Sequence, residues 1–138
     1  MDVWRQELRR NFTSLSHLAD FLQLTSEQRA LLLTRPSFGL NLPFRLAEKM
    51  AKGSVEDPLF VQFVPLAQEL IEAPGFSKDP VQDAASQKTC KLLQKYAGRA
   101  LLLTTGACAM HCRFCFRQHF PYDGEAGVSL ELAGIAED

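Results

Sequence analysis

Residues 100–115 read ALLLTTGACAMHCRFC, and this segment is the most informative part of the 138-residue chain. It starts with a continuous apolar run over residues 100–103, which is typical of a strand buried on both faces, as in a parallel sheet. Three cysteines, Cys108, Cys112 and Cys115, follow in one short loop. In strand–helix folds, functional loops lie at the carboxyl ends of strands. We therefore expect a functional loop directly after a buried strand, which is the one strand that the sequence predicts clearly.

The spacing of the three cysteines suits a metal or cluster site. A secreted disulfide scaffold spreads its cysteines to join distant segments, whereas these are bunched. Thiolates are the usual ligands of iron–sulfur clusters, and a [4Fe–4S] cluster held by three of them keeps one iron open for a small molecule. The spacing also suits a zinc site that His111 or His119 completes. The cysteines alone leave both readings open.

The cysteine motif and its surroundings resemble a known family. Cys-x3-Cys-x2-Cys with an aromatic residue, Phe114, before the third cysteine resembles the radical S-adenosylmethionine superfamily. The flanking residues 73–80, 95–103 and 112–122 are similar to the lysine 2,3-aminomutase family. They are most similar to the branch that makes (R)-β-lysine for the modification of elongation factor P. The catabolic branch carries a Thr-Arg-Arg-Arg-like continuation where this chain has Phe-Arg-Gln-His at residues 116–119.

The resemblance implies a function. It implies an isomerase that converts L-α-lysine to (R)-β-lysine with a [4Fe–4S] cluster, S-adenosylmethionine and pyridoxal 5′-phosphate. Cys108, Cys112 and Cys115 match the cluster ligands. By position, Arg117 matches the arginine near the S-adenosylmethionine carboxylate, and Arg99 and Lys95 match positions near the phosphate of pyridoxal phosphate. Arginine suits such oxyanions because it donates two parallel hydrogen bonds, and lysine serves as a point charge.

The resemblance also implies a fold. We expect an α/β chain in which a helical N-terminal extension, residues 1–97, precedes the first strand and cluster loop of an incomplete radical S-adenosylmethionine barrel of partial TIM type, residues 98–138. No catalytic residue is identified within the chain. The Schiff-base lysine for pyridoxal phosphate and the glycine-rich segment for S-adenosylmethionine are expected beyond residue 138.

Local signals predict short helices before the cysteines. Apolar residues recur every three or four positions over residues 4–22, and Thr13-Ser14 is expected to divide this stripe into two helices. Thr25 and Gln28 form a candidate capping box, and Asp57-Pro58 marks another helix start. Proline at position 65 should kink or restart that helix.

Further helices are predicted over residues 44–51, with Gly53 as the C-terminal cap, and over residues 89–96. A weak helix is predicted over residues 128–138, and residues 72–83 carry the turn signals of a long surface loop.

Composition excludes several classes of protein. Hydrophobic residues make up 46% of the chain, which argues against disorder, and 15 Lys and Arg balance 16 Asp and Glu, which argues against a nucleic-acid coat protein. No apolar run approaches the roughly 18 residues of a membrane helix, and the start is too polar for a signal peptide. We expect a cytoplasmic protein whose partners are L-lysine and, functionally, elongation factor P; a homo-oligomer is compatible with the sequence. The alternatives are a truncated non-catalytic remnant and a zinc-binding interaction module.

Overall fold

The computed structural model describes residues 2–89, 91–115, 118 and 119. The chain divides into two compact units. Met1–Pro74 and Cys108–Gln118 form the first, named the helical unit, whereas Gly75–Ala107 and His119–Asp138 form the second, named the hairpin unit. The weak helix predicted over residues 128–138 lies outside the described residues.

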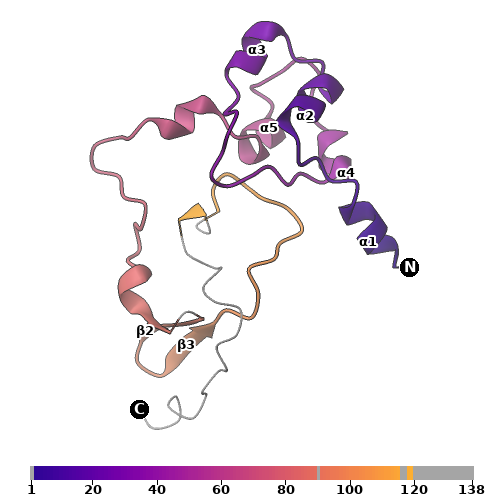
Figure 1. The fold of residues 1–138 in the computed structure, drawn as a ribbon. Coiled ribbons are helices and arrows are strands. Elements are labelled where there is room, and N and C mark those ends of the chain that lie inside the picture. The colour runs from indigo at the N-terminus through magenta and orange to yellow at the C-terminus, as the bar shows by residue number, and fades with distance from the viewer. Residues whose placement is uncertain (1, 90, 116–117, 120–138) are drawn as a thin grey trace. The chain divides into compact units, whose positions relative to one another are not determined.

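Short helices and the loops that connect them form the helical unit (Figure 1). As predicted, Thr13 and Ser14 separate the first two helices, and the Ser14 side chain accepts a hydrogen bond from the backbone N–H of His17. Short polar side chains favour such caps because they satisfy backbone N–H groups that have no partner inside the helix. The elements are α1 Val3–Leu8, α2 Leu15–Phe21, α3 Ser26–Ala30, α4 Phe44–Ala47, α5 Pro58–Phe63 and the 3₁₀ helix η1 Ala67–Leu70.

The predicted helix starts are confirmed at α3 and α5. Thr25 and Gln28 form the reciprocal capping box, with hydrogen bonds of 3.3 Å and 2.9 Å. Asp57 caps α5, and Pro58 occupies its first turn. This helix ends at Phe63, before Pro65, because proline cannot supply a backbone N–H to a continuing helix.

The helix predicted over residues 44–51 is shorter than expected. It ends at Ala47, and Gly53 does not cap it. Gly53 instead adopts a left-handed backbone, with φ of +65°, and donates its N–H to the carbonyl of Leu22 at 2.7 Å. A long-range hydrogen bond therefore uses the conformational freedom of this glycine.

The core of the helical unit comes from helices and from the loops between them. The most deeply buried side chains are no more than 1% exposed and include Leu18, Leu22, Leu42, Phe60 and Val64. Burying one such side chain stabilises a fold by about 1.5–3 kcal/mol. The loops join this core through the backbone as well, as the bridges Phe12–Leu42 and Leu32–Leu66 show.

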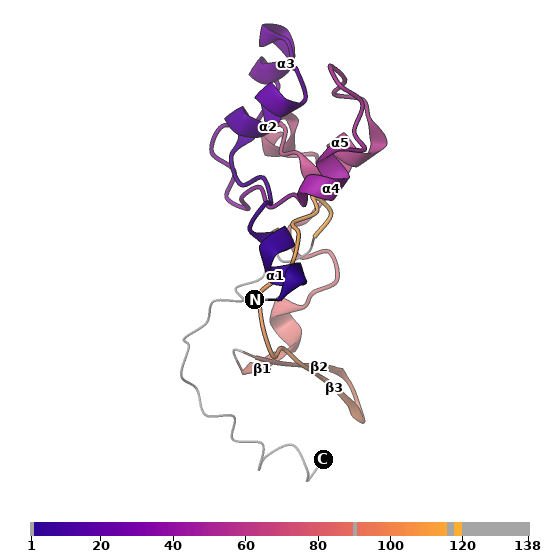
Figure 2. The same cartoon turned by 90° about the vertical axis from the view of Figure 1, so that its right-hand side faces the viewer.

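The hairpin unit contains a three-stranded antiparallel sheet in the order β1-β2-β3 (Figure 2). A 3₁₀ helix, η2 (Ala84–Ser86), precedes β1 (Gln87–Thr89), β2 (Leu92–Tyr96) and β3 (Arg99–Leu102). As predicted, residues 72–83 contain no helix or strand. Gly98, with φ of +72°, lies in the turn between β2 and β3, where a left-handed backbone favours glycine.

The helix predicted over residues 89–96 is wrong, because this segment forms the end of β1 and all of β2. Leu92 and Leu93 lie opposite Leu102 and Leu101 in the ladder. Cross-strand pairs of this kind stabilise a sheet, and they outweigh the weak helical pattern of the segment alone.

The strand predicted over residues 100–103 is confirmed in position, as β3, but its environment is not the predicted one. β3 pairs antiparallel with β2, and its four residues are exposed, with Leu101 54% exposed. The prediction of burial on both faces is therefore wrong within the described residues. An apolar run reveals that a strand can be covered, but the neighbours that cover it are set by the rest of the structure.

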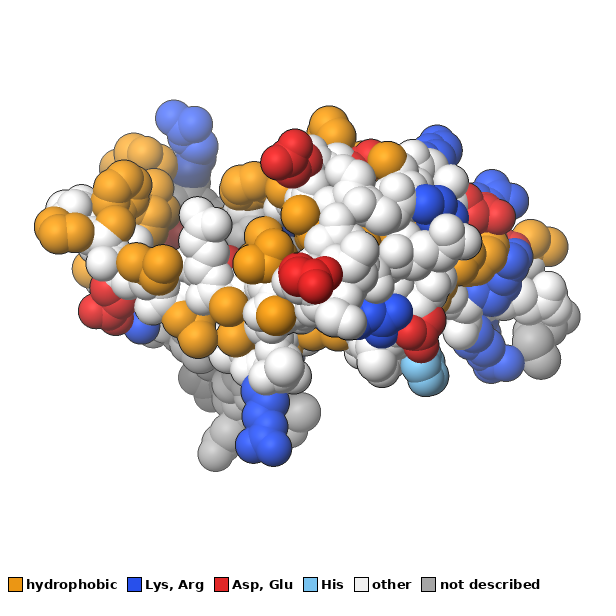
Figure 3. Space-filling view, turned by 90° about the horizontal axis from the view of Figure 1, so that it is seen from above, with side chains coloured by type: hydrophobic (Ala, Val, Ile, Leu, Met, Phe, Trp, Pro, Cys, Tyr) orange, Lys and Arg blue, Asp and Glu red, His pale blue; other side chains and the backbone are white. Residues whose placement is uncertain are grey.

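Charged side chains of both signs are interspersed on the molecular face in Figure 3, in keeping with the balanced composition. Within the described residues, no helix has the length and apolar character required to cross a membrane.

Candidate metal and cofactor site

The predicted cysteine loop belongs to the helical unit. Cys108 is exposed, Cys112 and Cys115 are half-buried, and all three are thiols rather than disulfides. Met110 and Cys112 pack against the hydrophobic core of the unit. The backbone N–H of Cys115 donates to the carbonyl of Cys112 at 3.2 Å, so the loop turns between its second and third cysteines.

The thiols match an iron–sulfur cluster in their chemistry, since three of them lie on one loop with at least partial access to solvent. Their side chains are not gathered into a finished coordination sphere. Among the described residues, no group of three or more His, Cys, Asp or Glu side chains is placed to hold a metal ion. The donor set therefore fits a cluster, and the sulfur atoms must turn toward a common centre when one binds.

Two asparagines hold the start of the cysteine loop. The side-chain amide of Asn11 donates to the backbone carbonyl of Ala109 at 2.9 Å and to the side-chain oxygen of Asn41 at 2.7 Å. Asn41 donates its own amide to the carbonyl of Cys108 at 3.2 Å. These bonds anchor the backbone at and beside the first cysteine.

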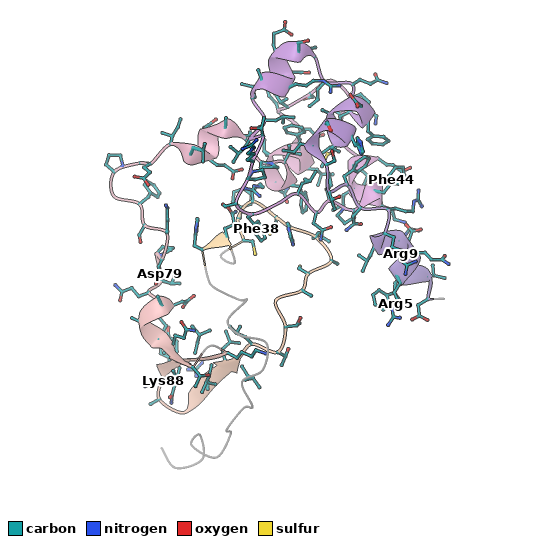
Figure 4. All side chains as sticks on the ribbon, in the orientation of Figure 1. Arg5, Arg9, Phe38, Phe44, Asp79 and Lys88 are labelled. Atoms are coloured by element: carbon teal, nitrogen blue, oxygen red, sulfur yellow. The ribbon has the colours of Figure 1, made fainter. Side chains whose placement is uncertain are left out.

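His111 is anchored through both its backbone and its ring. Its N–H donates to the carbonyl of Asn41 at 2.8 Å, and its Nδ1 lies 2.9 Å from the carbonyl of Gly39. The ring stacks on Phe38 with a centroid distance of 4.4 Å. Figure 4 labels Phe38, which belongs to the same helical unit as His111. The contacts give His111 a structural role, whereas His119 is exposed.

Arg113 makes the most extensive contacts of the loop. Its Nε donates to Oε1 of Glu69 at 2.8 Å, and its Nη2 pairs with Oε2 of the same carboxylate. Its Nη1 donates to the carbonyl of Phe38 at 2.9 Å. The Arg113 side chain is 6% exposed and that of Glu69 is 30% exposed, so a largely buried guanidinium meets a partly exposed carboxylate in a bidentate ion pair.

The structure places the three predicted cofactor cations differently. Arg99, on β3, lies with its guanidinium 5.6 Å from the ring centroid of Tyr96. Lys95, on β2, pairs with Asp83 at 3.5 Å and donates to the carbonyl of Val81. Both residues belong to the hairpin unit, and both contact residues of that same unit. Arg117 lies outside the described residues.

The sequence pattern does not predict which residues anchor the cysteine loop. Asn11, Asn41 and Glu69 lie between 44 and 98 residues from the loop positions that their side chains contact. No local pattern marks an asparagine or a glutamate as the partner of so distant a segment. Only the fold identifies them.

No family model matches the chain, but comparison with known proteins identifies relatives of it. It is 41% identical over 93 residues to the L-lysine 2,3-aminomutase of Haemophilus influenzae, a match covering 67% of this chain and 28% of the relative. It is 38% identical over 126 residues to the L-lysine 2,3-aminomutase of Escherichia coli, covering 90% and 36%. It is 32% identical over 131 residues to that of Buchnera aphidicola, covering 94% and 38%.

The chain thus spans about a third of the length of these relatives. The relatives are isomerases by name, and two of the matches extend over nine-tenths or more of this chain, the cysteine loop included in that span of sequence. The chain belongs to the L-lysine 2,3-aminomutase family.

Proposed function

We propose that Cys108, Cys112 and Cys115 hold a [4Fe–4S] cluster in an aminomutase that uses S-adenosylmethionine. One observation carries the proposal: three thiols lie on a single loop whose backbone is anchored to the helical unit, in a chain related to L-lysine 2,3-aminomutases. When bound, the cluster and S-adenosylmethionine supply radical chemistry, and pyridoxal phosphate supplies the site that holds the substrate amino group. Three thiolate ligands leave one iron open for S-adenosylmethionine.

The residues of the loop support such a centre in different ways. Cys112 and Cys115 are half-buried, so the helical unit shields them from water on one side, while Cys108 remains exposed toward incoming iron and sulfide. Burial and shielding tune the reduction potential of a cluster. Arg117 follows the third cysteine, and we assign it to the carboxylate of S-adenosylmethionine.

We assign Arg99 and Lys95 to the phosphate of pyridoxal phosphate. The two residues lie on adjacent strands of one sheet, Lys95 on β2 and Arg99 on β3. Lys95 must exchange its contact with Asp83 for the phosphate. A phosphate dianion is the stronger partner for an ammonium group that is exposed to solvent, so this exchange is feasible.

The finer assignment is a lysine 2,3-aminomutase that makes (R)-β-lysine for elongation factor P, acting in the cytoplasm. We further propose that residues 1–97 extend a barrel domain that starts at residue 98, with β3 as its first strand. The exposed leucines of β3 support this, because further strands would find apolar surface there. The relatives are about two and a half times as long as this chain, so the proposals concern the longer protein as well.

Anaerobic reconstitution with iron and sulfide tests the proposal. The chain should take up both in the ratio of a [4Fe–4S] cluster. After reduction, its electron paramagnetic resonance signal should shift when S-adenosylmethionine is added. Cys112→Ser should abolish the cluster, whereas Cys90→Ser, outside the loop motif, should keep it. Tight binding of zinc without cluster assembly would contradict the proposal and favour a zinc-binding module.

The second candidate is a chain that binds the cluster without converting lysine. The observation in its favour is that this chain spans about a third of its relatives. Incubating the reconstituted chain with lysine, S-adenosylmethionine, pyridoxal phosphate and a reductant separates the two, with β-lysine as the readout. Measuring the intact mass of the native protein shows whether a longer polypeptide carries the activity.

A further inference from the structure

Arg113 lies inside the cysteine motif, but the proposed cluster does not by itself explain the contacts of its side chain. It is the residue between Cys112 and Phe114, yet its side chain turns away from solvent to meet Glu69 and the carbonyl of Phe38. The Arg113 side chain is 6% exposed and its Glu69 partner 30% exposed, so removing the guanidinium from water has a desolvation cost, and losing Glu69 would leave that charge without its partner. A solvated arginine would avoid both costs. The arrangement therefore favours one geometry of the loop over others.

The remaining contacts of the loop converge on the same segment. The backbone N–H of Arg113 donates to the carbonyl of Gln62 at 2.6 Å. Asn11 and Asn41 hold the carbonyls of Ala109 and Cys108. The anchors thus lie at and directly after the first cysteine and directly after the second.

A loop with this many anchors has lost much of its conformational freedom before any metal arrives. Fixing the backbone of a residue costs conformational entropy, and a flexible loop would have to meet this cost at the moment of cluster binding. Residues that orient the ligands of a metal commonly change its affinity by about 10–100-fold when they are replaced. Anchors of this kind let the helical unit supply that order in advance.

We propose that Glu69 and Arg113 are positioning residues for the cluster: Glu69 holds Arg113, and Arg113 holds the backbone between the second and third cysteines. We name the Glu69–Arg113 pair the clamp. The inference rests on the proposed function, because the clamp is assigned to a cluster at these thiols. It assigns no contact between Arg113 and substrate. The clamp acts on the cluster indirectly, because it holds the backbone that carries the cysteine ligands.

The test compares iron retention in four versions of the full chain: the parent, Glu69→Gln, Arg113→Lys and Asp20→Asn. Asp20→Asn is the matched control, since it breaks an ion pair with Arg29, at 2.7 Å, whose carboxylate side chain is 68% exposed and which makes no contact with the loop. Each chain is reconstituted anaerobically, and release of iron to a chelator is followed well below the melting temperature of each apo chain. Glu69→Gln and Arg113→Lys should release iron about 10–100 times faster than the parent, and Asp20→Asn should match it.

Electron paramagnetic resonance separates positioning from mere stability. A less ordered loop should broaden the signal of the reduced cluster in Glu69→Gln and Arg113→Lys, but not in Asp20→Asn. If the clamp only stabilised the fold, Glu69→Gln and Arg113→Lys would lower the melting temperature and leave both the signal and the iron release unchanged. That result, in variants with parental circular dichroism, overturns the inference.

Arg113→Lys keeps the test decisive if Glu69→Gln fails to fold. The lysine keeps the positive charge but cannot donate two parallel hydrogen bonds to Glu69, so iron release should still rise. An unchanged rate in this variant overturns the inference as well. If the parent itself assembles no cluster, the proposed function fails; if it assembles one that no variant weakens, only the clamp fails.

Discussion

Asp57 shows how one side chain can organise two segments of the helical unit. Its Oδ1 accepts hydrogen bonds from the N–H groups of Leu59 and Phe60, at 2.8 Å and 3.1 Å, and so caps α5. Its Oδ2 accepts from the N–H of Ala51 at 3.0 Å. The cap follows from the local sequence, whereas the bond to Ala51 depends on how the chain returns to this point.

Replacing Asp57 by alanine should lower the free energy of unfolding by about 1–2 kcal/mol, because it removes an N-cap and leaves backbone donors without a partner. Urea denaturation followed by circular dichroism measures the change. Thr25→Ala, which removes the cap of α3, offers a comparison of similar size. An unchanged denaturation midpoint in Asp57→Ala would show that water replaces the carboxylate without loss.

The same carboxylate makes stability depend on pH. The hydrogen bond from the Ala51 backbone, followed by those from Phe60 and Leu59, lowers the pKa of Asp57 despite some opposing desolvation. A group with a lowered pKa in the folded state contributes stability above its unfolded pKa, near 3.9, and loses it as the pH falls through the folded pKa.

We therefore expect the stability difference between the parent and Asp57→Asn to be largest near neutral pH and to shrink below about pH 4. Asparagine retains the capping oxygen but has no charge to titrate. Urea denaturation at pH 7, 5 and 3 measures the difference. A constant difference across this range would rule out the contribution of the Asp57 charge.

At the scale of elements, β2 and β3 show that burial rather than apolar character sets the importance of a leucine. Leu92 and Leu93 are 8% and 7% exposed, whereas Leu101, opposite Leu93, is 54% exposed. Each strand carries two consecutive leucines, Leu92 and Leu93 in β2 and Leu101 and Leu102 in β3. The leucines differ in exposure because different neighbours surround them in the structure.

In this chain, Leu92→Ala should destabilise the hairpin unit by about 2 kcal/mol or more, since truncating a buried leucine leaves a cavity. Leu101→Ser should change stability by about 0.5 kcal/mol or less, as expected for an exposed position. Hydrogen exchange of the β2 and β3 amides measures both. A large loss of protection in Leu101→Ser would mean that β3 is covered in solution.

At the scale of the whole molecule, the two units differ in the size of their cores. The buried cluster centred on Phe60 belongs to the helical unit. In the described part of the hairpin unit, the buried hydrophobic residues are Leu92 and Leu93. A small sheet with so little buried apolar area is marginally stable.

Amides in the helical unit should therefore exchange more slowly than those of β2 and β3. Suitable reporters are Leu22 and Val64, whose N–H groups make 2.8 Å hydrogen bonds within or at the ends of α2 and α5. Phe60→Ala should abolish much of this protection, because truncating a buried phenylalanine costs about 3–5 kcal/mol. Mass spectrometry of exchange in the parent and the variant measures it, and equal protection in both units would refute the expected order.

Much of the helical unit follows from short-range patterns. The caps at Ser14, Thr25 and Asp57, and the stop before Pro65, arise from hydrogen bonds between residues a few positions apart. The three cysteines define the candidate donor set in the same way, because ligand type and spacing are properties of one short loop. For these features the nearest residues carry the necessary physical information.

The tertiary structure decided what depends on distant partners. It made residues 92–96 a strand, since Leu92 and Leu93 pair with leucines of β3. It left β3 exposed rather than buried, and it joined Arg113 to Glu69, 44 residues away. The sequence by itself determined where helices start and which side chains can bind a cluster. Which segments meet was set by the fold, because burial and long-range pairing are gains shared among residues that no local pattern links.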